Sequence, residues 1–103
     1  MKKRTNTYAS VWDAIADTPQ QAANLRVRAD LMQQIAELIQ SKGWKQVEAA
    51  ERCGVTQPRI NDLLLGRVSR FSLDALVNIA TALGKRVSFG LKAAQSTSAV
   101  GSA

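Results

Sequence analysis

A chain of 103 residues, of which 46% are hydrophobic and 21% charged, has the size of one small domain. Because it has no histidine and only one cysteine, a Ser-His-Asp or Cys-His catalytic set, a histidine metal site and an intrachain disulfide are excluded. The formal net charge is +6, and the positive charge gathers in residues 1–4, 42–70 and 85–103, which favours an anionic partner such as nucleic acid.

The sequence also argues against a membrane protein and an enzyme. No apolar run approaches the ~18 residues of a membrane span, and the basic residues 2–4 are followed by polar residues, unlike a signal peptide. The pairs Asp13/Asp17 and Glu48/Glu51 have helical spacing, which is more typical of a solvated face than of a catalytic dyad. We therefore expect a cytoplasmic, non-enzymatic protein that uses no metal or other cofactor.

The N-terminal part predicts a short helix and then a long one. We expect residues 1–9 to be a flexible basic segment and residues 10–16 to form the short helix. Thr18 is a typical N-cap, and Pro19 suits the first helical position, so the long helix begins here. Its apolar residues recur at helical spacing as far as Lys42, after which a glycine ends it.

Three shorter helices are predicted to follow. The first covers about residues 45–52, the second begins after the N-cap Thr56, and the third begins after the N-cap Ser72. Each of the last two ends at a glycine. The inward candidates of the first of these helices are Val47, Ala49 and Ala50.

After these helices the hydrophobic period changes to two. Polar and apolar residues alternate in residues 86–91, which predicts a strand. Its apolar face consists of Val87, Phe89 and Leu91. Because a strand must pair its backbone groups, we expect residues 85–92 to form a dimerisation strand with a second copy; residues 5–9 of the same chain are the alternative partner. We expect residues 93–103 to be a disordered tail, since they offer little to bury.

The segment from residue 46 to residue 65 predicts two helices that meet over a tight turn. Ala50 gives the first helix a small side chain where the two backbones approach, and Gly54 can take a positive φ in the turn. The alternative is a pair of ordinary core helices joined by a glycine. Apolar residues occupy the positions that a bent helical pair buries, namely Ala49, Cys53, Val55, Ile60 and Leu63.

Residues 44–67, WKQVEAAERCGVTQPRINDLLLGR, resemble the XRE (Cro-like) family of helix-turn-helix regulators. Residues 10–19, residues 70–74 and the predicted strand resemble a subgroup of that family, the HigA-like antitoxins. The resemblance implies an all-α, lambda-repressor-like bundle of five helices over residues 10–84, with one C-terminal β-strand that pairs across a dimer.

In this family the helix after the turn lies in the DNA major groove, with its N-terminal part against base edges. Gln57 then suits adenine, Arg59 suits guanine or a phosphate, and Asn61 suits either a base or a phosphate. A solvated polar face is the alternative for these side chains. The other candidates for DNA contact are Lys45, Gln46, Thr56, Pro58, Asp62, Arg67 and Arg70.

Three positions depart from the family's pattern. Lys45 replaces a threonine that usually caps the first helix of the motif, and losing such a cap costs ~1 kcal/mol unless another contact compensates. Asp62 directs a negative charge toward phosphates unless it pairs with an arginine or a cytosine amino group. Leu65 is apolar where a basic residue is common. These departures leave the base preference open.

The sequence thus predicts a sequence-specific repressor that binds a palindromic operator as a homodimer. The antitoxin resemblance implies that it regulates its own operon and binds a RelE/HigB-like toxin. A stand-alone regulator without a toxin and a helical adaptor that binds only protein are the alternatives. Trp12 is the strongest candidate for toxin contact, although it can instead pack on the chain's own long helix, while Trp44 and Cys53 are expected in the core. The candidate toxin contacts are Val11, Trp12 and Ile15.

Overall fold

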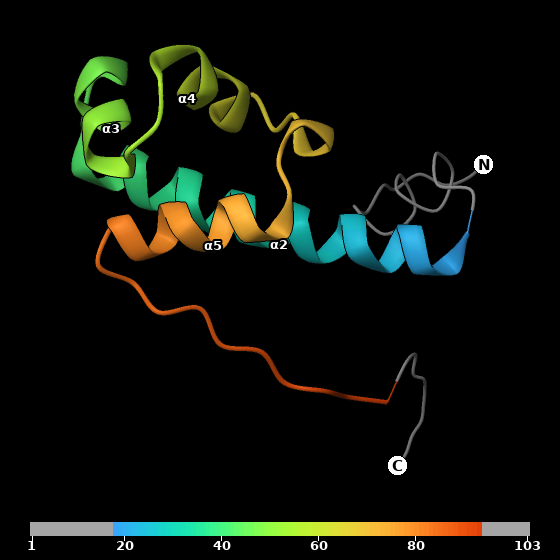
Figure 1. The fold of residues 1–103 in the computed structure, drawn as a ribbon. Helices are drawn as coiled ribbons and strands as arrows, with labels where there is room; N and C mark the ends of the chain where they lie inside the picture. The colour runs from blue at the N-terminus through green and yellow to red at the C-terminus, as the bar shows by residue number, and fades with distance from the viewer. Residues whose placement is uncertain (1–17, 94–103) are drawn as a thin grey trace.

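The computed structural model describes residues 18–93, which form four α-helices and one 3-10 turn (Figure 1). The chain is therefore mainly helical, as predicted. The short helix predicted over residues 10–16 lies outside the described residues, so the count of five helices stays a prediction. In chain order the elements are α2 (Pro19–Lys42), α3 (Gln46–Cys53), α4 (Gln57–Leu64), η1 (Val68–Arg70) and α5 (Leu73–Ala82).

Three of the four described helices begin with a hydroxyl side chain that accepts a backbone N–H of the first turn. The exception is α3, whose N-cap residue Lys45 makes no side-chain cap hydrogen bond. Each cap satisfies one of the donors that have no partner inside the helix. The capping pairs are Thr18 with Gln21 at 3.0 Å, Thr56 with Arg59 at 3.4 Å and Ser72 with Ala75 at 3.0 Å.

The long helix α2 organises the bundle. It packs against α4, α5 and η1, while α3 packs against α4 and α5. In Figure 1, α2 and α5 run side by side, and α3 and α4 lie together on one side of them. The core takes side chains from every element, and its largest fully buried members are Ile39, Ile60, Leu63, Phe71 and Leu76. Burial of each such side chain contributes about 1.5–3 kcal/mol.

One face of α3 enters this core, and Val47 is not on it. Ala49, Ala50 and Cys53 are buried, whereas the Val47 side chain is 57% exposed. The prediction that Val47 points inward was therefore wrong. At 100° per residue, Val47 lies 200° from Ala49, so the two side chains point to nearly opposite sides of the helix and one side cannot bury both.

Trp44 and Cys53 both pack on the core, to different extents. Trp44 is half-buried against the core cluster, and the Arg52 guanidinium lies over its ring, 5.1 Å from the centroid. Cys53 is buried as a free thiol, and desolvation raises its pKa. A thiol in that environment is a poor nucleophile.

The segment after α5 forms no strand in the single chain. Residues 85–93 have no regular secondary structure, and no strand occurs among residues 18–93. Val87 is half-buried against the core, but Phe89 is 64% exposed and Leu91 is fully exposed. No described segment pairs with these residues as a strand, and residues 5–9, the alternative partner, lie outside the described residues, so the strand and its partner stay predictions.

No helix within residues 18–93 combines the length and the apolar composition needed to cross a membrane.

Candidate nucleic-acid interface

The turn between α3 and α4 has the geometry that its glycine predicts. Gly54 is left-handed, with φ 72° and ψ 31°, and its N–H donates to the last turn of α3. The next residue, Val55, donates its N–H to the Ala50 carbonyl at 3.0 Å. These bonds close the C-terminus of α3 and reverse the chain, so that α4 packs back on α3. The bent helical pair is therefore confirmed.

One side of α4 is buried and the opposite side faces solvent. Ile60 and Leu63 lie in the core with exposed fractions of at most 1%. Gln57 and Pro58, in the first turn, are exposed, and Asn61 is half-buried one turn later. The N-terminal half of α4 thus presents polar side chains outward.

The start of each helix in the pair is open to an anion. Thr56 is exposed and caps α4 with its hydroxyl, and Gln46 is half-buried at the first position of α3. The cationic residue Lys45, at the N-cap of α3, is exposed, and its side chain makes no cap hydrogen bond. A helix N-terminus with such a neighbour favours a phosphate.

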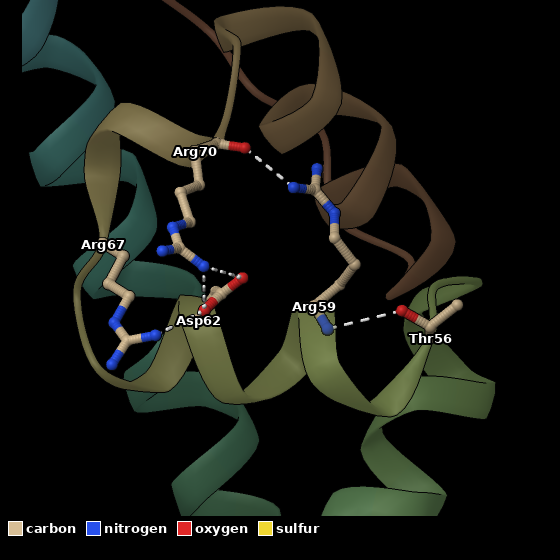
Figure 2. Close-up of polar contacts among 5 residues, drawn as sticks. All are labelled: Thr56, Arg59, Asp62, Arg67 and Arg70. Atoms are coloured by element: carbon tan, nitrogen blue, oxygen red, sulfur yellow. Dashed lines mark hydrogen bonds and ion pairs between the residues drawn. The ribbon is translucent and has the colours of Figure 1, made fainter.

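Asp62 joins two arginines of the loop that follows α4. Its Oδ1 accepts Nη1 of Arg67 at 3.0 Å and Nη1 of Arg70 at 3.3 Å, and its Oδ2 lies 3.4 Å from the latter (Figure 2). The Asp62 side chain is only 13% exposed, whereas those of Arg67 and Arg70 are 47% and 57% exposed. The arginine pairing that the sequence offered for Asp62 is therefore present.

Arg59 lies against the same loop and does not extend into solvent. Its Nη1 donates to the Arg70 carbonyl at 2.7 Å, as Figure 2 shows, and its guanidinium carbon lies 4.1 Å from the centroid of the Phe71 ring. A planar guanidinium can stack and donate at the same time. The structure thus brings Arg59 and Asp62 of α4 against the same loop, which carries Arg67 and Arg70.

Arg28 on α2 also holds the loop that follows α4, and the sequence did not predict this contact. Its Nη1 donates to the Phe71 carbonyl at 3.0 Å, and its Nε is buried with no partner among the described residues. The two residues are 43 positions apart, and no local pattern marks such a contact. Phe71 is itself buried, so the loop after η1 is anchored from both α2 and α4.

The candidate dimerisation residues lie away from α4. A groove runs between α2, α5 and residues 85–92, and its lining includes Val87 and Phe89. Leu91 follows in the same segment and is exposed. The candidate toxin contacts Val11, Trp12 and Ile15 lie outside the described residues. Other apolar side chains that line the groove are Val27, Leu31, Leu38 and Leu83.

The comparison with protein families agrees with this geometry. Residues 14–92 match a family model described as a helix-turn-helix domain. The match covers all the described helices and most of the segment after α5. No curated protein matches the chain.

Proposed function

The chain belongs to the helix-turn-helix domain family, and we propose that it is a sequence-specific transcriptional repressor that reads its operator with α4. The observation that carries this proposal is the division of α4 into a buried side and an exposed side. Ile60 and Leu63 hold the helix on the bundle, while Gln57 and Pro58 are exposed and Asn61 is half-buried. In the proposed complex these three residues face the major groove, which a recognition helix enters.

Charged and polar groups around α4 suit the DNA backbone. Arg67 and Arg70 are exposed in the loop that follows α4. Lys45 and Gln46 lie at the start of α3, and Thr56 lies at the start of α4. Contacts of this kind fix the register of a protein on DNA without reading its sequence. Base reading falls to the first turns of α4, where Gln57 suits adenine.

The test of this proposal is binding to the DNA upstream of the protein's own gene over a salt series. Specific binding that weakens steeply with salt is expected, because phosphate contacts release counterions. Gln57→Ala should lower the affinity by about tenfold and relax the preference at one base pair. Gln40→Ala is the matched control, because Gln40 is exposed near the end of α2 and outside the proposed interface. Weak binding that is the same for every DNA sequence contradicts the repressor and favours a protein-binding adaptor.

We also propose that the repressor is a homodimer joined through residues 85–92. Phe89 and Leu91 are exposed apolar side chains on a segment that forms no strand within residues 18–93, and a groove lies beside it. Pairing with the same segment of a second copy satisfies the backbone groups and covers both side chains. A twofold dimer also suits a palindromic operator with half-sites about 34 Å apart.

The finer proposal is that this repressor is the antitoxin of a RelE/HigB-like toxin. It is supported by the resemblance of residues 10–19 and 70–74 to HigA-like antitoxins, and it assigns toxin contact to Val11, Trp12 and Ile15. A small reading frame beside this gene, whose product co-purifies with the chain, is the expected observation. Loss of co-purification in Trp12→Ala, with unchanged DNA binding, would place the contact there. A gene with no such neighbour indicates a stand-alone regulator.

A further inference from the structure

Two side chains of α4 hold the loop that follows it. Arg59 and Asp62 are three residues apart on the helix and therefore lie on the same side, which faces residues 67–71. We propose that both are positioning residues: Arg59 fixes the loop on α4, and Asp62 aims the guanidinium groups of Arg67 and Arg70 at the DNA backbone. This inference rests on the proposed function and specifies how the site holds phosphate.

The contacts of Arg59 leave its guanidinium little freedom to read a base. It stacks on Phe71 at 4.1 Å and donates to the Arg70 carbonyl at 2.7 Å. To reach guanine it must leave both contacts and uncover Phe71, which is only 1% exposed. Arg59 therefore serves the loop, and base reading falls to Gln57 and Asn61.

The charges around Asp62 explain how one carboxylate can favour binding to an anion. Arg67 and Arg70 both contact its Oδ1, so the carboxylate reduces the repulsion between two guanidinium groups held close together. Asp62 is almost covered while both arginines are about half-exposed. Two arginines pair with one carboxylate, so the group keeps a net positive charge.

Arg67 and Arg70 carry N–H donors beyond those that contact Asp62. A guanidinium has five N–H groups, and within residues 18–93 the side chains of Arg67 and Arg70 donate only to Asp62, through Nη1 in each case. The remaining N–H groups are held in a fixed orientation at the surface. A phosphate that binds there therefore meets donors that are already ordered, which reduces the entropy lost on binding.

The test compares binding of the upstream DNA by the full-length protein and by Asp62→Ala, over a salt series, in two backgrounds. In the wild-type background the substitution should weaken binding about tenfold and make the salt dependence shallower by about one phosphate contact, although it removes a negative charge. In an Arg67→Ala/Arg70→Ala background it should weaken binding no further. Asp62→Asn, which keeps the side-chain volume, is measured alongside, so that a folding defect in one variant does not decide the result.

The opposite results overturn the role of Asp62. If this carboxylate only repels phosphates, then Asp62→Ala and Asp62→Asn strengthen binding in both backgrounds and leave the specificity unchanged. A wild-type protein that binds no DNA specifically overturns the proposed function itself, and this role with it. Wild-type binding that neither substitution weakens overturns the positioning role alone.

The role of Arg59 is tested with a panel of operators that each carry one changed base pair. A positioning residue predicts that Arg59→Ala weakens binding to every operator by a similar factor, and that Arg59→Lys does not restore it, since an ammonium cannot stack and donate as a plane. A guanine reader predicts loss of discrimination at a single base pair. That second pattern would overturn the assignment.

Discussion

Arg52 on α3 lies over the Trp44 ring at 5.1 Å and pairs with Glu48 at 3.2 Å, so its guanidinium both stacks on a ring and donates to a carboxylate. Arg59 on α4 also lies over a ring, that of Phe71, but its guanidinium donates to a backbone carbonyl, that of Arg70. The Arg52 contacts are exposed, and each is worth less than about 1 kcal/mol. The Arg59 contacts matter more for function because they hold a segment that carries other arginines.

Lys45 is the residue whose substitution should stabilise the protein. Lys45→Thr supplies the missing hydroxyl cap of α3, and a cap contributes ~1 kcal/mol. For a domain of this size that gain raises Tm by roughly 4–8 °C, measurable by thermal unfolding followed by circular dichroism. Lys45→Ala removes the same charge at the same position without supplying a hydroxyl cap and is the control.

An equal change in Tm for both lysine variants would mean that charge, and not capping, is responsible. If the Lys45 side chain also contacts a phosphate, the same Lys45→Thr protein should bind DNA less tightly and with a salt dependence reduced by about one contact. Stability and affinity then move in opposite directions, which identifies a cap given up for DNA binding.

The helical pair is the element on which the interface depends, and its turn depends on Gly54. A Cβ at Gly54 meets nothing within 4 Å, so the cost of a side chain there comes from the backbone alone. With φ at 72°, Gly54→Ala should lower the free energy of unfolding by about 1–2 kcal/mol, as measured by urea denaturation. Gly54→Asn should cost less, because asparagine tolerates the left-handed region better.

Gly90→Ala is the control for that substitution. Gly90 also has open space around it, but its φ lies outside the left-handed region, so alanine there should change stability by a few tenths of a kcal/mol at most. Similar losses for both alanine variants would show that the turn is not the strained position.

Short-range pattern was enough to predict these elements. The caps at Thr18, Thr56 and Ser72 and the left-handed Gly43 and Gly54 fix where helices begin and end, and each signal acts within four residues. The prediction for Val47 was wrong because the buried side of α3 is set by Ala49, Ala50 and Cys53, and Val47 lies on the other side of the helix.

The arrangement of the arginines was beyond the same reasoning. Arg59 turns toward the loop because Phe71 and the Arg70 carbonyl are there, and those neighbours are set by the path of residues 67–71. The sequence offered Arg59 a guanine, a phosphate or a solvated face, and no local pattern indicates its contact with the loop. The Arg28 contact depends on packing between segments that are distant in sequence.

At the scale of the whole molecule, the proposed dimer depends on the segment after α5. Phe89→Asp should convert a wild-type dimer into a monomer and weaken operator binding, because it places a charge in the proposed seam. Sedimentation velocity checks the oligomeric state. Ser88→Asp adds the same charge at the neighbouring exposed position, which falls on the opposite face of a strand, and should leave the dimer intact.

Monomeric wild-type protein, or equal dissociation by the two aspartate variants, would contradict a strand-mediated dimer. The alternation in residues 86–91 predicts which residues share a face, but a strand needs backbone partners. The sequence therefore predicts an interface that forms only when a second copy supplies the backbone partners.

The placement of α2 has a mechanical consequence. Arg28 grips the Phe71 carbonyl from one side of this helix, while Val27 and Leu31, on neighbouring positions, line the groove. A helix of 24 residues turns as one stiff rod, and a close-packed interior transmits strain. A ligand or partner in the groove that shifts α2 would therefore also move the Phe71 carbonyl, and with it the loop that we propose contacts DNA.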